Sequence, residues 1–431
     1  MTWPAYAGPD TRPSTARAAG EDRLDLWRIT VFGLALFVLF TYTQGWVMPI
    51  FGEKGDRFTG ILRVAFLPAY GATFILLATA PMETLKGLIR QPFLIALVLV
   101  VVASTFWSVN PTESARRAFF LMCSTLGGVV LAARFRWRGL AEVTASAFLI
   151  VAVASLVVSA AVPSIGRMTE LFPGAWRGLW PEKNALGSNM ALAFSALVAA
   201  GLLAPQRRYL WWGGALIALF LVLMSTSKTS LVALFLGAGV IAFIAVVRRG
   251  PVIGVAATWA ALIVIGLGAA VFLFAADALF GVLGKDATLT GRTQIWAAAM
   301  RQIQLRPWTG FGYEAVWGDK SGWGPFAWIV KEAKFEPQHA HNSWIEQWLG
   351  LGLIGLAAFG FYYLQTATMM VLAIFRRKGA YLAAPFFAVY TMMTLTESIA
   401  VVYNDFRWVL LVAFSTKLAL TDHPEERDAR R

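Results

Sequence analysis

Cysteine, histidine and charged side chains are scarce in this chain of 431 residues. Charged residues make up 14% of it and hydrophobic residues 58%, whereas a soluble domain carries about a quarter charged residues. The single cysteine, Cys123, lies in an apolar run, which excludes a disulfide or a thiolate metal site within the chain. This composition excludes a soluble enzyme and a nucleic-acid-binding protein, although the net charge is +13.

Long apolar runs are what the chain has in abundance. A run of about 20 apolar residues is enough to cross a bilayer as a helix, and such runs recur along the whole sequence. They predict an all-α, polytopic integral membrane protein with about twelve transmembrane helices. The predicted spans are 29–51, 61–81, 93–109, 115–133, 140–162, 185–204, 209–226, 230–247, 252–275, 343–374, 380–396 and 399–420.

The basic residues indicate how these spans are oriented. Lysines and arginines cluster in the short loops after even-numbered spans of the membrane domain, residues 29–420. The positive-inside rule places such loops in the cytoplasm, where they can also contact anionic lipid headgroups. Both termini are then cytoplasmic, with a disordered tail predicted at 1–28 and a second tail at 421–431. The long loop 276–342, which is expected to contain short helices, faces the periplasm or the cell exterior.

Two of the three histidines, His339 and His341, lie one residue apart where this long loop meets the span at 343–374. An imidazole suits proton transfer near neutral pH, so His341 is a candidate base for an acceptor hydroxyl; a helix cap is the alternative interpretation. His339 is expected to shape the loop. The pair also suggests a metal site, but the sequence offers no third ligand at metal-site spacing, although Glu336 and Glu346 lie nearby. We therefore predict no metal.

The segment TLTGRTQIWAAAMRQIQLRPW predicts a short helix from Arg292 to Leu305, with Thr290 as its N-cap and Pro307 ending it. Arg292 then stands at a helix N-terminus, where unpaired N–H groups and the helix dipole already favour an anion. Its guanidinium adds bidentate hydrogen bonds to phosphate; a plain surface arginine is the alternative. The helix is expected to lie along the membrane surface on an apolar face formed by Ile295, Ala299 and Ile303.

Further cations lie on the same outer face. Arg177 and Lys183 lie in RGLWPEKNALG, where Asn184 is expected to cap the following span, and Lys228 lies among hydroxyls in STSKTS. Snorkelling toward lipid phosphate is the alternative explanation for Lys228. Together with the candidate base and the arginine of the short helix, these residues describe an outward-facing site suited to a diphosphate on a membrane lipid.

Four motifs resemble segments of the bacterial O-antigen ligase and Wzy-type polymerase superfamily. His341 and Asn342, followed after nine residues by Gly352-x-x-Gly, match its histidine motif completely. TGRTQIW resembles its Gly-Arg-x-x-x-Trp segment, STSKTSL its Ser-x-Ser-Arg segment, and WRGLWPEKNALG a segment of ExoQ-like exopolysaccharide polymerases. The chain departs from these patterns at Glu182, where histidine is usual, and at Lys228, where arginine is usual. Lysine keeps the charge but loses the bidentate fork.

The resemblance implies glycosyl transfer at the outer face of the bacterial inner membrane. The donor would be a glycan on undecaprenyl diphosphate, and His341 would be the base that deprotonates the acceptor hydroxyl. Arg292 and Arg177, helped by Lys183, would hold the pyrophosphate and stabilise its departing charge. Because a lipid pyrophosphate is already a good leaving group, the resemblance implies no metal or nucleotide cofactor.

Three functions remain open from the sequence. A polymerase of a surface polysaccharide, with another lipid-linked repeat unit as acceptor and a chain-length regulator protein as a further partner, is favoured by the ExoQ-like segment. An O-antigen ligase, with lipid A–core as acceptor, shares the same chemistry. A transporter or flippase would explain charged residues in the late spans, namely Glu397, Asp405 and Arg407. The lack of an internal repeat and the long one-sided loop argue against transport.

Overall fold

The computed structural model describes residues 14–52, 59–170, 172–274, 291–319 and 321–422. Over these ranges every regular element is a helix, apart from an isolated antiparallel bridge between Arg167 and Trp176. The predicted all-α class is confirmed. The helices that build the bundle and its outer end are α1 (Ser14–Tyr42), α2 (Val47–Phe51), α3 (Thr59–Ala65), α4 (Leu67–Thr79), α5 (Pro81–Ile89), α6 (Pro92–Ala103), α7 (Pro111–Arg134), α8 (Trp137–Ala161), α9 (Pro163–Gly166), α10 (Lys183–Leu203), α11 (Arg208–Met224), α12 (Lys228–Val247), α13 (Pro251–Phe274), α15 (Arg292–Leu305), α16 (Pro325–Ala333), α17 (Ser343–Arg376), α18 (Ala380–Thr394) and α19 (Phe406–Ala419).

The described residues contain seven helices that are long and apolar enough to cross a membrane, or eight if a bent pair forms one span. In that pair α5 and α6, extended to Trp107, are bent by 86°. Every predicted span contains a helix, and the protein is a multi-pass membrane protein. The count of twelve spans is not confirmed, because helices such as α18 and α19 have only 15 and 14 residues, short of the length needed to cross a bilayer.

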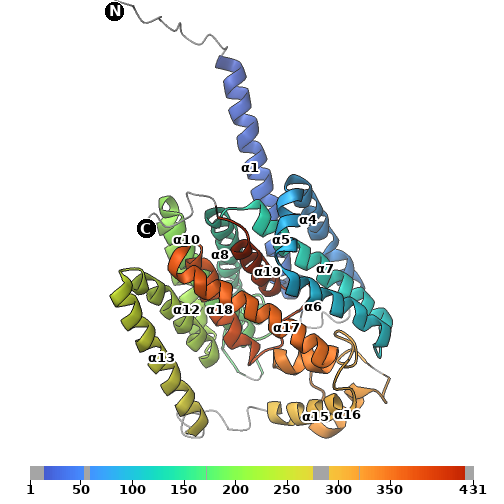
Figure 1. The fold of residues 1–431 in the computed structure, drawn as a ribbon. Coiled ribbons are helices and arrows are strands. Elements are labelled where there is room, and N and C mark those ends of the chain that lie inside the picture. Colours follow the sequence, from blue (N-terminus) through green and yellow to red (C-terminus); the bar gives the residue numbers. More distant parts are fainter. Residues whose placement is uncertain (1–13, 53–58, 171, 275–290, 320, 423–431) are drawn as a thin grey trace, which may run out of the picture.

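The first helix begins earlier than predicted. The sequence predicts a disordered tail through residue 28, but α1 is helical from Ser14 and projects from the bundle in Figure 1. The prediction is wrong for residues 14–28, and residues 1–13 lie outside the described ranges. The segment STARAAGEDRLDL is rich in alanine, arginine and leucine, which are strong helix formers, and it runs directly into the apolar part of the helix.

The centre of the bundle is built on α10, which packs against α8, α11, α12 and α18. Its small residues allow close approach: a Cβ at Gly187 would lie 2.5 Å from the Ser230 hydroxyl oxygen. The contact between α7 and α19 is similar, because a Cβ at Gly128 would lie 2.6 Å from the Val409 carbonyl oxygen. Small residues at helix contacts are the usual packing device of membrane helices.

The long helix α17 is broken at Gly352, whose φ and ψ are +68° and −170°. A break frees backbone hydrogen-bonding groups, and the preceding loop binds them. The Leu353 N–H donates to the Pro307 carbonyl at 2.8 Å, and the Gly312 N–H donates to the Gly350 carbonyl at 2.8 Å. Irregular backbone is tolerated within a membrane helix when neighbouring protein satisfies it in this way. The span predicted at 343–374 is therefore interrupted near its first third.

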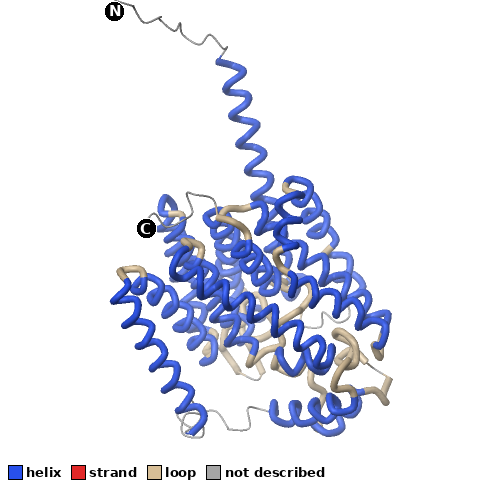
Figure 2. The backbone as a smooth tube through the Cα atoms, in the orientation of Figure 1, coloured by secondary structure: helices blue, strands red, loops and turns tan. Residues whose placement is uncertain are grey.

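At the end of the bundle where α17 begins, α15 and α16 pack together (Figure 1). Figure 2 shows long loops gathered at the same end. The predicted helix bounds of Arg292 and Leu305 are confirmed. Its predicted N-cap, Thr290, is wrong, because Gly291 with φ of +85° occupies the N-cap position. The apolar face expected to lie on the membrane packs against protein instead, in a small core formed with α16 and α17 by Ala298, Ala299, Ile303, Phe311, Val316, Phe326, Ile329 and Leu349.

Candidate active site

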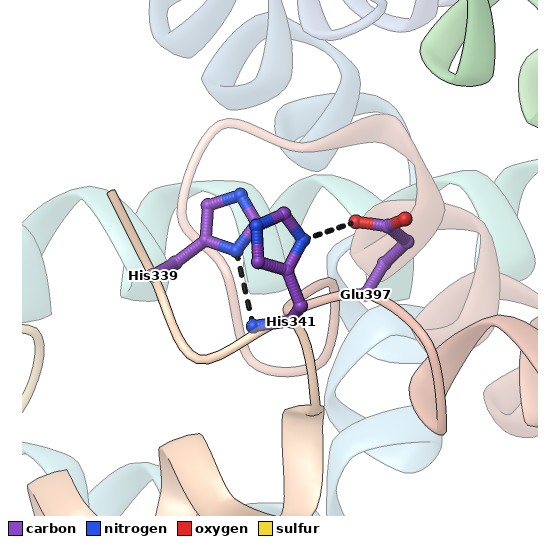
Figure 3. A group of neighbouring side chains, drawn as sticks. All are labelled: His339, His341 and Glu397. Carbon is purple, nitrogen blue, oxygen red and sulfur yellow. Dashed lines mark hydrogen bonds and ion pairs between the residues drawn. The ribbon is translucent and has the colours of Figure 1, made fainter. Parts of the chain in front are cut away.

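Three side chains from separate segments meet at this end of the bundle. His341 precedes α17, Glu397 follows α18, and Arg292 is the first residue of α15. The Nδ1 atom of His341 lies 3.2 Å from Oε2 of Glu397 (Figure 3), and a guanidinium nitrogen of Arg292 lies 3.2 Å from Oε1. The two oxygens of one carboxylate therefore hold the predicted base and the predicted phosphate-binding arginine together.

The start of α17 fixes both partners of this pair. His341 has a φ of +50°, a left-handed conformation that is strained for a residue with a side chain. Asn342 next to it caps α17 by accepting the N–H groups of residues 344 and 345. The hydroxyl of Ser343 donates to the Glu397 carbonyl at 2.7 Å and accepts the N–H of Ile399 at 2.9 Å. One helix start thus positions both the histidine and the backbone that carries Glu397.

The pKa of Glu397 lies below its ordinary value. Burial alone would raise this pKa, but the hydrogen bond with His341 and the positive charge of Arg292 outweigh it. The carboxyl group is therefore ionised at neutral pH. An ionised carboxylate beside an imidazole orients the ring and stabilises its protonated form.

His339 has the opposite character. Burial, followed by the neighbouring His341, lowers the pKa of His339 to about 4, so its ring is neutral at pH 7. Its Nδ1 accepts the backbone N–H of His341 at 3.2 Å, which leaves the proton on Nε2 (Figure 3). The ring centroids of the two histidines are 4.0 Å apart. The contact of His339 with the His341 backbone is of the kind expected for a residue that shapes the loop.

The same cluster contains Glu397, a potential metal ligand that the sequence spacing does not reveal. One ligand atom each from His339, His341 and Glu397 lie within 4.8 Å of one another, so the fold supplies a third potential ligand that does not stand at metal-site spacing in the sequence. Glu397 is 56 residues from His341, beyond any local metal-binding spacing. The donor set fits a divalent ion only in part, because the Arg292 guanidinium already lies 3.2 Å from the same carboxylate and opposes a second cation.

A second carboxylate, the half-buried Glu346, supports the loop beneath the site. It accepts the Ala340 N–H at 3.0 Å, the Ser398 hydroxyl at 2.9 Å and the indole N–H of Trp317. These bonds tie the residue before His341 to the residue after Glu397. In the sequence Glu346 is visible only as a neighbour of the histidines.

The remaining predicted cations lie in a second group. The guanidinium of Arg177, 7% exposed, donates to the carbonyls of Ile165 at 2.8 Å and Ser164 at 3.3 Å within its own loop. Lys183 donates to the Thr226 hydroxyl at 3.2 Å and lies 3.7 Å from the centroid of the Phe172 ring. The two motifs are therefore brought together by the fold, as neighbouring loops.

One detail of this second group differs from expectation. The sequence predicts Asn184 as the cap of the span, but the helix already starts at Lys183 with Glu182 at the N-cap position. Asn184 thus lies inside the first turn, because the extended backbone ends at Glu182 rather than two residues later. Lys228 is the first residue of α12, whose cap is the Ser227 hydroxyl accepting the Ser230 N–H at 3.4 Å.

Asp405 and Arg407, two of the charged residues in the late predicted spans, form an ion pair. The Arg407 Nε lies 2.9 Å and 3.1 Å from the two carboxylate oxygens, and Asp405 also caps α19. Residues 395–405 contain no α-helix, so Glu397 and Asp405 lie in a loop. The predicted span at 399–420 is helical only from Phe406.

Fold and site thus define an all-α multi-pass membrane protein with a histidine, a carboxylate and a guanidinium joined at one end of the bundle. Residues 213–360 match a family model described as O-antigen ligase. Over 352 residues the chain is 27% identical to the exopolysaccharide production protein ExoQ of Rhizobium meliloti (strain 1021), covering 77% of this chain and 73% of that protein. The family model and this relative confirm the resemblance to the O-antigen ligase and Wzy-type polymerase superfamily that the motifs show.

Proposed function

We propose that this chain is a membrane glycosyltransferase that polymerises a bacterial surface polysaccharide. It would transfer a glycan from undecaprenyl diphosphate to a hydroxyl of a second lipid-linked glycan. The observation that carries the proposal is the convergence of His341, Glu397 and Arg292 from three segments, with both contacts at 3.2 Å. The family match and the ExoQ-like relative support a polysaccharide-processing membrane enzyme.

His341 acts as the general base. Because its Nδ1 faces the ionised Glu397, the neutral ring carries its proton there and leaves the lone pair on Nε2. Nε2 takes the proton of the acceptor hydroxyl as the acceptor oxygen bonds to the anomeric carbon. The imidazolium that forms is stabilised by Glu397 at its other nitrogen. Positioning of this kind and charge stabilisation together make up the catalysis.

Arg292 receives the leaving group. The bond between the anomeric carbon and the phosphate oxygen breaks, and its electron pair leaves with the lipid diphosphate. A guanidinium has five N–H donors, so Arg292 can hold Glu397 with some and a phosphate oxygen with others. The N–H groups of the first turn of α15 face the same charge. Attack opposite the leaving group inverts the anomeric centre, with Arg177, Lys183, Asn184 and Lys228 as further proposed diphosphate contacts.

We place the site in the periplasm, in the inner membrane, with both termini in the cytoplasm. α17 starts beside His341 and ends 34 residues later at Arg376, and the basic residues Arg377 and Lys378 follow. The site and a basic loop therefore lie at opposite ends of one helix, and basic loops are cytoplasmic.

O-antigen ligation is the second candidate, because the family model carries that description. A ligase performs the same displacement on a different acceptor, lipid A–core. Nothing in the histidine–carboxylate pair distinguishes the two acceptors, so the products must be compared.

The test is the surface polysaccharide profile of a deletion strain complemented with wild type, His341→Ala or His423→Ala at matched protein level. His423, in the C-terminal tail, is the matched control. Loss of long chains with accumulation of single lipid-linked units in His341→Ala supports the polymerase. Long chains that remain on undecaprenyl diphosphate and never reach lipid A assign the protein as a ligase. A wild-type profile in His341→Ala refutes the proposed base.

A further inference from the structure

A cavity of about 910 Å³, lined in part by the loop that carries Glu397, is not used by the mechanism above. Its wall is formed by residues from the segment between α1 and α4, which includes α2 and α3, by the first half of α7, by the loop after α15 and by the loop at 395–405. Ligand-binding cavities in proteins commonly have volumes of about 300–1,000 Å³. The cavity is therefore large enough for a substrate portion much bigger than a phosphate group.

One loop connects this cavity to the site of transfer. Glu397 binds His341, and Val402, five residues further on, already lines the cavity. Five residues of fully extended chain span at most about 18 Å, which sets an upper limit on the separation of their backbones. The distal end of the loop is fixed, because the Asn404 carbonyl accepts the Gln44 amide at 2.9 Å.

The lining has the mixture of groups that a sugar requires. Two arginines, Arg116 and Arg117, are both paired with Glu113 and lie in the same wall as the rings of Phe120 and Tyr403. The rings offer apolar faces for the C–H groups of a sugar, while planar guanidinium and amide groups offer directed hydrogen bonds to its hydroxyls.

Charge distinguishes this cavity from a diphosphate site. The positive charges of Arg116 and Arg117 are opposed by the ion-paired Glu113 and by two further acidic residues of the same lining, Glu314 and Asp319. A site with balanced charges has no strong preference for an anion. Asn404 adds a neutral amide held in one orientation, since its Oδ1 accepts the Tyr70 hydroxyl at 2.6 Å.

We propose that this cavity binds the sugar residues of a lipid-linked saccharide and holds them within one loop length of His341. The proposal rests on the proposed function, because it assumes that the substrate of the site is a glycan. The occupant is either the single repeat unit or the end of the growing chain, which share the same chemistry.

The test measures binding without turnover. Full-length protein in lipid nanodiscs, carrying His341→Ala in every case, is titrated by calorimetry with the repeat-unit oligosaccharide released from the strain's own polysaccharide. Leu62→Trp fills the cavity without removing a polar group, and Arg117→Gln removes a lining cation. Arg301→Gln is the matched control, since Arg301 is 66% exposed and pairs with Glu332 outside the lining.

We expect both cavity variants to weaken binding at least tenfold and Arg301→Gln to leave it unchanged. Equal binding by all proteins, or no binding by any, overturns the proposal. Oligosaccharides of one and two repeat units show whether the occupant is the single repeat unit or the end of the growing chain. Equal affinity assigns the cavity to the single unit, and higher affinity for the longer one assigns it to the growing chain. If the oligosaccharide binds as expected but His341→Ala gives a wild-type polysaccharide profile in cells, the proposed catalytic role of His341 is refuted and the proposed role of the cavity is kept.

Discussion

Glu314 lies in the loop after α15 and lines the cavity. Its carboxyl group makes the stability of the folded protein depend on pH. Burial, then the charge of Glu346, raises the pKa of Glu314 to about 7, although Arg117 opposes this rise. The Arg117 guanidinium donates to the Glu314 carbonyl and not to its carboxyl group. The carboxyl group is therefore held in the fold without a bond that favours its charged form.

The sign and size of the effect follow from the two pKa values. Below about pH 4.5 the carboxyl is protonated in the folded and the unfolded chain, and it has no effect on the free energy of unfolding. Between about pH 4.5 and 7 the unfolded chain ionises first, so the folded state loses stability as pH rises. Above pH 7 both states are ionised and the loss stays constant at about 3 kcal/mol, from a pKa raised from 4.5 to about 7.

Glu314→Gln removes this dependence while keeping the shape of the side chain. We expect the variant to gain stability over wild type as pH rises from about 5 to about 8, reaching a few degrees in Tm at the upper end. The assay is thermal unfolding of the purified full-length proteins in detergent, with the exposed Glu336→Gln as control. A difference in Tm that is constant across this pH range, or that shrinks as pH rises, would refute the reasoning.

Three further predictions concern the site and its support. Glu397→Gln should lower the rate of glycan transfer about 100-fold by removing the charge that orients and stabilises the histidine; added to His341→Ala it should cause no further loss, and additive losses would show independent roles. Arg292→Lys should lower kcat about tenfold by losing the guanidinium fork, and an unchanged rate in the same transfer assay would remove its contact with the diphosphate. Gly352→Ala should abolish the yield of folded protein in detergent, since a Cβ there would lie 2.2 Å from the Trp308 carbonyl; a normal yield and elution profile would contradict this.

Sequence patterns predict those parts of the fold that depend on local residues. Apolar runs locate a helix in every predicted span, and the bounds of α15 are predicted to the residue because Arg292 and Pro307 mark its two ends. The predicted count of twelve crossing helices is not confirmed, and hydropathy cannot show where an apolar run is interrupted. Gly352 is such an interruption, and it depends on the loop that satisfies the freed backbone, a tertiary partner that no local pattern shows.

In the candidate site, too, local patterns can be predicted from the sequence and tertiary partners cannot. The histidine and the arginine can be found from motifs, but their common partner cannot. Glu397 is visible as a charge in an apolar region and suggests transport, because a membrane charge indicates a pathway when its partner is unknown. Asn184 is misplaced for a local reason: the helix starts at Lys183, two residues before the start that a cap at Asn184 would give.

The segment matched by the family model contains only part of the candidate site and ends before this carboxylate. Residues 213–360 include Arg292 and His341 but end before Glu397, although the three side chains form one group in the structure. The loop that carries Glu397 is held at one end by Ser343 of α17 and at the other by Gln44, just after α1. The geometry of the base therefore depends on the packing of the first helix as well as on the matched segment. A truncated protein limited to that segment would contain the histidine motif without the carboxylate that orients it or the cavity beside it.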